Sequence, residues 1–310
     1  MSYYDVIIIG GGPAGLTAGL YAARARLNCL LLEKAVPGGQ ITLSERIENY
    51  PGFPGGGIGA FELAERMKQQ AEEFGLQIMS DEARAVSRDD DRLFKIKLDQ
   101  KEILSRSLIL AAGTEANKLG VPGEEEFTGK GVSWCAVCDA AFYKDKRVVV
   151  VGGGDTAVEE ALFLTKFASE VFLAHRRDKL RSVKILADRA LANPGIKPVW
   201  DSVVTRIMGD KTVNRVLLKN VKNNEEHSLD CSGVFISIGS RPNSALVRGL
   251  VDLDDRGYII TDRDMKTSCP GIFACGDVRQ KSLRQVVTAC GEGAAAAYSA
   301  GQYLEQRGGL

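Results

Sequence analysis

Short runs of apolar residues that end in glycine set the pattern of this chain, and the first one spans residues 5–10. It contains three consecutive isoleucines and does not alternate between apolar and polar positions, which is typical of a parallel strand buried on both faces. A glycine-rich loop, Gly10–Gly15, follows, and the small residues of 16–25 predict a helix. A second apolar run, 29–33, ends on a glutamate. This order of strand, loop, helix and strand predicts a dinucleotide-binding unit.

The same order of elements returns at residues 147–167. The second glycine loop contains Gly152 and Gly154, and apolar residues predict a strand before it and a helix after it. A chain with two such units can hold two dinucleotides and pass electrons from one to the other. We therefore predict an α/β fold built from two Rossmann-like, three-layer ββα dinucleotide-binding domains, with the second inserted in the first.

Further elements are expected between and after the two units. Apolar residues at helical spacing predict a helix over 60–74, and an alanine-rich stretch predicts another over 283–306. The charged residues of 88–92 are typical of a hairpin turn. Apolar runs predict short strands at 83–88, 92–98, 102–105, 107–114, 257–261 and 271–277, and in the inserted part around Val199 and Val204 and at 213–218 and 233–238.

The length of 310 residues suits two hydrophobic cores better than one. The repeat places the first dinucleotide-binding domain over residues 1–115 and 245–310 and the second, which contains the cysteine pair, over 116–244. The segments 114–119 and 239–243 are the expected linkers between the two domains.

Charge and hydropathy argue against several kinds of partner. Forty basic residues balance forty acidic ones, so no net field favours nucleic acid or an anionic membrane. The first residues lack the basic flank and cleavage site of a signal peptide, and no apolar run approaches the roughly 20 residues of a membrane span. We expect a cytoplasmic protein.

Two of the seven cysteines, Cys135 and Cys138, are separated by two residues. Such a pair is half of a zinc site, two unrelated structural thiols or a redox couple. Zinc needs four ligands, and the sequence has no second pair of this spacing and two histidines in total, so we expect a redox couple and no metal. A helix that begins at Cys135 would favour its thiolate. The remaining cysteines are expected to be buried as small apolar groups: Cys29, Cys231, Cys269, Cys275 and Cys290.

The residue that ends the second strand differs between the two units. Glu33 lies eighteen residues after Gly15, where a carboxylate suits the free ribose hydroxyl of FAD or NAD. Eighteen residues after Ala157 the chain reaches His175 instead, and the cations around it suit a 2′-phosphate. The sequence therefore predicts FAD in the first unit and NADPH in the second. The expected NADPH contacts are Gly152, Gly154, Asp155, Thr156, Ala157, His175, Arg176, Arg177 and Arg181.

Together with the two glycine loops, the segments Cys135–Asp139, His175–Arg177 and Ala274–Asp277 resemble the bacterial low-molecular-weight thioredoxin reductase family, within the class II pyridine nucleotide-disulfide oxidoreductases. The resemblance runs from about residue 4 to residue 304. It implies that Cys138 faces a flavin, that Cys135 attacks a partner disulfide and that Asp139 manages the thiol proton. It also implies FAD contacts at Gly10, Gly12, Pro13, Ala14, Gly15, Glu33, Gly39, Gln40, Asn49, Gly113, Gly276, Asp277, Arg284, Gln285 and Val286.

The activity that the resemblance implies is NADPH-dependent reduction of thioredoxin by a homodimeric flavoenzyme. Electrons would pass from NADPH to FAD, then to the Cys135/Cys138 disulfide and then to the partner. Because the disulfide and the nicotinamide site share one domain, that domain is expected to rotate about the two linkers. The alternatives on this fold are a reductase of another small disulfide protein, a ferredoxin-linked reductase and a dithiol oxidase. The alternative outside enzymes is a flavin-based redox sensor.

Four positions depart from the commonest pattern of the family. Ala112, Trp134 and Ala140 replace residues that are more frequent there, but none of the three removes a chemical group that the electron relay needs. Asp155 places a carboxylate near the expected pyrophosphate. We expect this charge to weaken nucleotide binding unless the side chain turns to cap the following helix.

Overall fold

The structure is a computed structural model that describes residues 3–43, 46–89 and 93–308. The chain divides into two compact units, which we describe separately. Unit 1 consists of Met1–Glu115 and Arg241–Leu310, and unit 2 consists of Ala116–Ser240.

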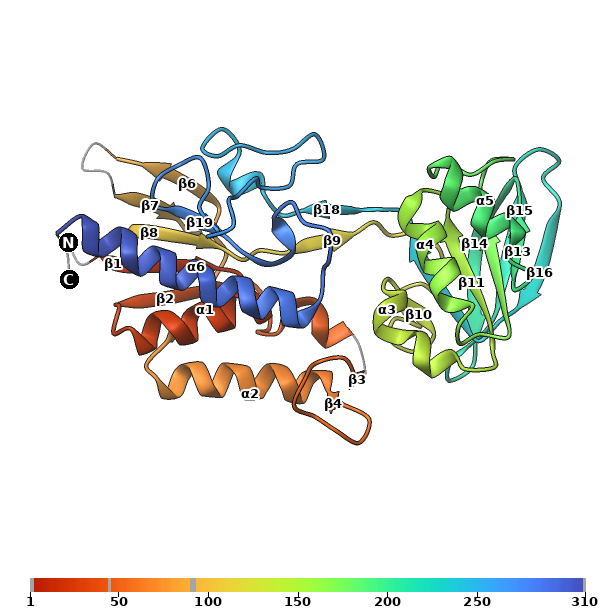
Figure 1. Cartoon of the computed structure of the whole chain (residues 1–310), viewed down its shortest axis with the longest axis horizontal. Coiled ribbons are helices and arrows are strands. Elements are labelled where there is room, and N and C mark those ends of the chain that lie inside the picture. Colours follow the sequence, from red (N-terminus) through yellow and green to blue (C-terminus); the bar gives the residue numbers. More distant parts are fainter. Residues whose placement is uncertain (1–2, 44–45, 90–92, 309–310) are drawn as a thin grey trace. The chain divides into compact units, whose positions relative to one another are not determined.

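Two short strands carry the chain from one unit to the other. β9 (Thr114–Ala116) leads into unit 2 and β18 (Ser240–Pro242) leads back, and the two strands pair with each other (Figure 1). They lie within the segments 114–119 and 239–243, where the sequence predicts linkers. The assignment of one cofactor to each unit stays a prediction.

A seven-stranded sheet forms the centre of unit 1. β5, β2, β1, β8 and β19 are joined by parallel pairing, and β7 and β6 extend the sheet from β8 by antiparallel pairing. Since β19 follows unit 2 in the chain, this sheet joins segments from both ends of the sequence (Figure 1). The strands are β1 (Tyr4–Ile9), β2 (Cys29–Glu33), β5 (Gln77–Ser80), β6 (Ala85–Arg88), β7 (Phe94–Lys97), β8 (Glu102–Leu110) and β19 (Ile272–Ala274).

β1 is buried on both faces, as its unbroken apolar run predicts. Val6 and Ile8 pack in one core with side chains of the covering helices, and Ile7 and Ile9 pack in a second core that includes Phe94. The side chains of these four residues are at most 6% exposed. Burial of each such side chain contributes about 1.5–3 kcal/mol relative to exposure, so the strand is firmly held.

Helices cover one face of this sheet in unit 1. α1 and α6 lie against each other, and Gly293 comes so close to Ala14 that a side chain at position 293 would collide with the Ala14 carbonyl oxygen. The remaining elements of unit 1 are α1 (Pro13–Arg24), α2 (Ala60–Glu73), α6 (Val286–Gln306), the short strands β3 (Arg46–Ile47) and β4 (Ile58–Gly59), and the 3₁₀ turns η1 (Gly39–Leu43), η3 (Ala245–Val247) and η4 (Gly276–Val278).

Unit 2 contains a parallel sheet of order β10-β17-β11-β12-β13 and a smaller antiparallel sheet of order β14-β15-β16. Val148 and Val150 of β11 pack in one core with α4, whereas Val149 and Val151 pack in a second core with the antiparallel sheet. The elements are β10 (Val132–Ser133), α3 (Ala136–Asp139), η2 (Ala140–Tyr143), β11 (Arg147–Gly152), α4 (Asp155–Leu164), β12 (Glu170–Ala174), α5 (Lys184–Ala192), β13 (Ile196–Val199), β14 (Ser202–Gly209), β15 (Val213–Asn220), β16 (Glu226–Asp230) and β17 (Gly233–Ser237). The predicted α/β fold with two Rossmann-like units is confirmed.

The pattern predicts separate strands at 102–105 and 107–114, whereas β8 runs without a break from Glu102 to Leu110. The polar residues at the expected break, Ser105 and Ser107, are fully buried. The Ser105 hydroxyl donates to the Ser107 carbonyl at 2.6 Å, and the Ser107 hydroxyl donates to the Asp5 carbonyl at 2.8 Å. Because both hydroxyls find backbone acceptors inside the core, these serines do not end the strand.

Other predicted boundaries are also wrong. Residues 257–261 form isolated bridges through Ile259 rather than a strand. The last helix begins at Val286 rather than at 283, since the side chains of Gln285 and Thr288 form a capping box there. β5, β16 and α5 have no counterpart in the predictions, because their exposed faces leave no clear apolar period.

Two further predictions concern a turn and the membrane. The predicted hairpin turn over 88–92 includes residues 90–92, which lie outside the described residues. Among the helices of the described ranges, none is long and apolar enough to cross a lipid bilayer.

Candidate active site

The first glycine loop joins β1 to α1 and depends on close backbone contacts. Gly10 has a φ of +107°, and a side chain there would collide with the Ala111 carbonyl. A side chain at Gly15 would collide with the Gly10 carbonyl oxygen. Gly12 caps α1 without a side chain, and Pro13 occupies its first turn, so backbone N–H groups at this helix end can receive an anion. The loop therefore has the geometry that a dinucleotide pyrophosphate requires.

Gly15→Ala is expected to lower the free energy of unfolding by about 3 kcal/mol or more, because the new methyl group must push the loop and α1 apart. Gly301→Ala in α6 is the matched control, since apart from its chain neighbours and the nearby backbone of α6 no described atom lies within 4 Å of the added methyl group. Alanine in a helix interior stabilises by up to about 1 kcal/mol relative to glycine. Urea unfolding followed by circular dichroism measures both variants, and equal stabilities would contradict the tight packing at Gly15.

Glu33, the last residue of β2, lies beside this loop. Its Oε2 atom accepts a hydrogen bond from the Gly11 N–H at 2.6 Å, and its Oε1 atom accepts one from the Ala35 N–H at 2.8 Å. The two bonds fix the carboxylate at the second glycine of the loop. A ribose hydroxyl bound there would find an acceptor already in place.

The segment after β2 and the C-terminal segments contain further predicted residues that contact one another or the first loop. A Cβ at Gly276 would lie 2.8 Å from the Ala14 Cβ, and one at Gly39 would lie 3.2 Å from the Gly12 Cα. Asn49 Nδ2 donates to Gln285 Oε1 at 2.8 Å. Gly39 and Gly276 thus contact the start of α1, and Asn49 bonds to the cap residue of α6.

Other predicted FAD residues are fixed by their own contacts. Gln40 Nε2 donates to the Thr114 carbonyl oxygen and lies 3.2 Å from the Thr114 hydroxyl. The Arg284 guanidinium lies 4.4 Å from the centre of the Tyr258 ring. Gly113 has a φ of +64°, a conformation that favours glycine, directly before the first connecting strand. Val286 opens α6 next to the cap residue Gln285.

A buried ionic cluster that the sequence reasoning missed supports Asp277. Glu292 of α6 accepts from the Gly276 N–H at 2.8 Å, from Arg279 at 2.9 Å and from Lys281 at 3.3 Å. Lys281 also lies 3.1 Å from Asp277, and its side chain is 7% exposed. The charged residues in the sequence of α6 are Glu292 and Glu305. Glu292 lies within a stretch of small residues, and this isolated carboxylate is the sequence signal for the ionic cluster.

The second glycine loop joins β11 to α4 in unit 2. Gly154 caps α4 without a side chain, which again leaves N–H groups for an anion. The Asp155 side chain does not cap α4, because its Oδ1 atom accepts from the Val183 N–H at 2.8 Å. The Arg181 N–H donates to the Gly153 carbonyl at 2.7 Å. Both bonds fasten the segment after β12 to the loop.

His175 differs from the arginines that follow it. It is 4% exposed, and its ring lies against Gly153 so closely that any side chain at position 153 would collide with it. Burial, assisted by Arg181, Arg177 and Arg176, lowers the pKa of His175. Arg176, Arg177 and Arg181 are all exposed. The histidine therefore shapes the loop as a neutral ring, and the positive charge comes from the arginines.

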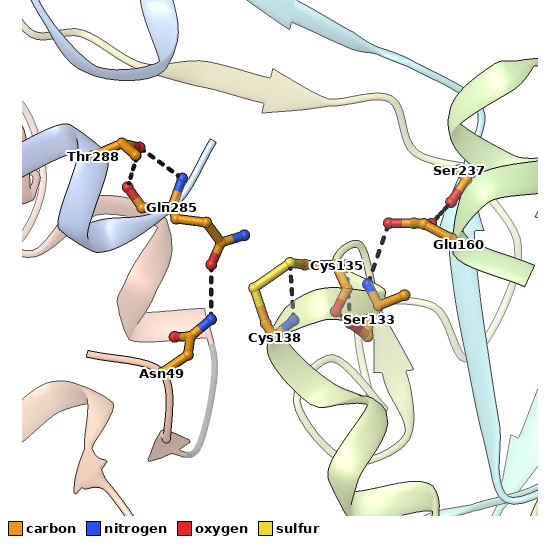
Figure 2. Close-up of a disulfide and its surroundings, with 9 residues drawn as sticks. Asn49, Ser133, Cys135, Cys138, Glu160, Ser237, Gln285 and Thr288 are labelled. Atoms are coloured by element: carbon orange, nitrogen blue, oxygen red, sulfur yellow. Dashed lines mark hydrogen bonds between the residues drawn. A yellow bond between two sulfur atoms is a disulfide. The ribbon is translucent and has the colours of Figure 1, made fainter. Parts of the chain in front are cut away.

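Cys135 and Cys138 form a disulfide with their Cα atoms 5.3 Å apart (Figure 2). Cys135 is the N-cap residue of α3, and its Sγ atom accepts from the Cys138 N–H at 3.2 Å. Its own N–H donates to the Ser133 hydroxyl at 3.1 Å. Asp139 ends the same short helix and donates its N–H to the Cys135 carbonyl. The described residues contain no group of three or more side chains that could hold a metal ion.

The remaining five cysteines are free thiols. Cys29, Cys231, Cys275 and Cys290 are buried, as predicted, whereas Cys269 is half-buried. Burial raises the pKa of the Cys29 thiol to about 11 and that of Cys231 and Cys275 to about 12. These thiols stay protonated at neutral pH and do not compete as nucleophiles.

Each unit joins a parallel sheet to a glycine-rich loop that opens a helix, and unit 2 adds a disulfide at the start of a short helix. This combination defines a class of α/β oxidoreductases that bind dinucleotides and act through a redox-active disulfide. The chain belongs to the pyridine nucleotide-disulphide oxidoreductase family, which matches residues 4–293. Membership implies a flavin and a pyridine nucleotide as cofactors.

Individual relatives agree with this family assignment. The chain is 46% identical to the thioredoxin reductase of Peptoclostridium acidaminophilum over 308 residues, which cover 97% of each chain. It is also 46% identical to the thioredoxin reductase of Listeria monocytogenes, over 98% of this chain and 94% of that protein. The crystal structure of thioredoxin reductase from Streptococcus pyogenes matches with a TM-score of 0.94 at 46% identity and covers 98% of this chain and 99% of that one. The resemblance inferred from the motifs is confirmed.

Proposed function

We propose that this protein is an NADPH-dependent flavoenzyme that reduces the disulfide of thioredoxin through FAD and the Cys135/Cys138 pair. One observation carries the proposal: the disulfide lies at the start of α3 in the same unit as a second dinucleotide loop. The names of the relatives support thioredoxin as the acceptor.

FAD is the proposed cofactor of unit 1. The Glu33 carboxylate beside Gly11 supports this choice, because it offers an acceptor to a free ribose hydroxyl and would repel a 2′-phosphate. A Cβ at Gly39 would lie 3.2 Å from the Gly12 Cα, so glycine suits the close contact between these two segments, and the absence of side chains lets the backbone approach a pyrophosphate. The proposed contacts are Gly10, Gly12, Pro13, Ala14, Gly15, Glu33, Gly39, Gln40, Asn49, Gly113, Gly276, Asp277, Arg284, Gln285 and Val286.

NADPH is the proposed electron donor, bound by unit 2. Three exposed arginines follow β12, and Arg181 is fastened to the glycine loop through its backbone, with its guanidinium 4.0 Å from the Cβ position of Gly154. Guanidinium groups bind phosphate by paired, charge-assisted hydrogen bonds, which suits a 2′-phosphate. The proposed contacts are Gly152, Gly154, Asp155, Thr156, Ala157, His175, Arg176, Arg177 and Arg181.

Bound FAD and NADPH would supply the two-electron chemistry, and the residues of the chain would handle sulfur and protons. Two electrons and two protons convert the Cys135–Cys138 disulfide to two thiols. The Cys135 thiolate then attacks the partner disulfide to form a mixed disulfide, and Cys138 displaces the reduced partner as it closes the internal disulfide again. Asp139, at the end of α3, is the proposed group that exchanges the thiol proton.

Three further features belong to the proposal. The acceptor docks at Cys135, the enzyme is a cytoplasmic homodimer, and unit 2 rotates about β9 and β18 between half-reactions. The family resemblance supports all three.

Anaerobic titration tests donor, flavin and acceptor together. The disulfide and the flavin each accept two electrons, so we expect two equivalents of NADPH to reduce both and bleach the flavin absorbance of the purified protein, and oxidised thioredoxin to restore it. NADH is the matched control and should bleach it far more slowly. A flavin spectrum that NADPH leaves unchanged would overturn the proposed enzyme.

A further inference from the structure

A carboxyl group outside the predicted site bonds directly to the redox helix. Glu160 lies in α4, and its Oε1 atom accepts from the Ala136 N–H at 3.2 Å (Figure 2). Ala136 follows Cys135 and is the first residue of α3. Glu160 therefore contacts the backbone one residue from the sulfur that is proposed to attack the partner.

The second oxygen of the same carboxyl group is also engaged. Oε2 accepts from the Ser237 hydroxyl, and Ser237 ends β17, where it pairs in register with Gly152 of the glycine loop. One side chain of α4 thus connects the end of a central strand to the start of the redox helix. These contacts all lie within unit 2.

Keeping Glu160 in this position is costly for the folded protein. Its two donors, a backbone N–H and a hydroxyl, are uncharged, so neither supplies a compensating cation. Burial raises the pKa of the Glu160 carboxyl, and the two hydrogen bonds oppose this shift only in part. In its charged form this half-buried carboxyl costs stability, and the hydrogen bonds from Ala136 and Ser237 offset part of that cost.

α3 needs such an external support. The helix has four residues, too few to be stable alone. Ala136 is fully buried, so water cannot replace Glu160 as the acceptor of its N–H. Without this acceptor, the turn that brings Cys135 and Cys138 together would lose the hydrogen bond that attaches its first residue to α4.

We propose that Glu160 is a positioning residue of the redox pair, whose carboxyl group holds the start of α3 against α4 and β17 so that Cys135 and Cys138 stay at bonding distance. The proposal rests on the proposed function in taking these cysteines as the redox couple. Glu160 acts through the backbone of Ala136, the residue that follows Cys135.

Full-length, flavin-loaded variants Glu160→Ala and Glu160→Gln test the role. Each is equilibrated in dithiothreitol redox buffers, trapped with an alkylating reagent and analysed by mass spectrometry of the peptide that carries Cys135 and Cys138. Glu160→Ala should shift the equilibrium toward the dithiol by about tenfold, which is ~30 mV for a two-electron couple, because the two thiols are no longer held together. Glu160→Gln keeps an acceptor of the same shape and should stay within about threefold of the wild type.

Matched variants separate this role from general damage. Glu159→Ala changes an exposed carboxylate of the same helix and should leave the equilibrium unchanged. Ser237→Ala removes one support of Glu160 and should shift the equilibrium in the same direction by a smaller factor, so it replaces Glu160→Ala if that variant does not fold. Wild-type values for Glu160→Ala and Ser237→Ala, or equal shifts for the Ala and Gln variants, would overturn the proposal.

The redox buffer makes the outcome independent of the proposed electron donor. Dithiothreitol reduces the cysteine pair whether or not NADPH does. Failure of NADPH to reduce the wild type would therefore count against the proposed function, whereas an unshifted Glu160→Ala equilibrium counts against Glu160 alone.

Discussion

Cys138→Ser is expected to abolish reduction of thioredoxin while flavin reduction by NADPH continues at the wild-type rate. The variant keeps both glycine loops and the exposed arginines, so the first half-reaction loses no contact. It cannot close the internal disulfide that receives the electrons and later releases the partner. We expect turnover with thioredoxin to fall by about 1,000-fold or more, since Cys138 is the described cysteine bonded to Cys135 and the other five are free thiols.

Stopped-flow absorbance measures flavin reduction, and steady-state oxidation of NADPH in the presence of thioredoxin measures turnover. Cys269→Ser is the matched control, because it removes a half-buried thiol of unit 1 that is not bonded to another cysteine. It should retain both activities. Thioredoxin reduction that survives in Cys138→Ser would show that electrons leave the flavin by another route.

Replacing Arg176 and Arg177 together by glutamine should change coenzyme preference. The two exposed guanidinium groups are expected to bond to the 2′-phosphate, and each charge-assisted bond contributes about 1.5–3 kcal/mol. Loss of both should lower kcat/KM for NADPH by about 100-fold and change kcat/KM for NADH by less than about threefold. His175 is buried against Gly153 with a lowered pKa, so it should not compensate for the lost charge.

Steady-state kinetics with both coenzymes provides the measurement. The double variant Arg189→Gln and Lys197→Gln removes the same net charge from exposed positions of unit 2 and serves as the control. It should change both coenzymes little, which excludes a general electrostatic effect. An equal loss for NADPH and NADH in the arginine variant would mean that these side chains do not read the phosphate.

The sequence predicts best those features that depend on neighbouring residues. Both glycine loops, the strands before them and the close cysteine pair are local patterns, and the structure has each of them. The spacing from Ala157 also reaches the residue that follows β12, where His175 lies against the loop.

The predictions are weakest where a contact joins distant segments. Glu160 bonds to Ala136 across 24 residues and to Ser237 across 77, and no local period indicates either contact. The polar residues Ser105 and Ser107 predict a strand end, but their acceptors, such as the Asp5 carbonyl, lie on a different strand or beyond the apparent break. The mean polarity of a segment is a poor guide to where a strand ends when a buried hydroxyl has its hydrogen-bond partner elsewhere in the chain.

The order of segments in unit 1 has a consequence for synthesis on the ribosome. β19 and the helix α6, which packs against Ala14, are translated after the whole of unit 2. Unit 2 is a continuous segment and can fold as soon as it emerges, whereas the first glycine loop must wait for the C-terminal helix. A nascent chain therefore acquires its redox disulfide segment before it can complete the proposed flavin site of unit 1, and we expect cofactor insertion to be a late step in the biogenesis of the enzyme.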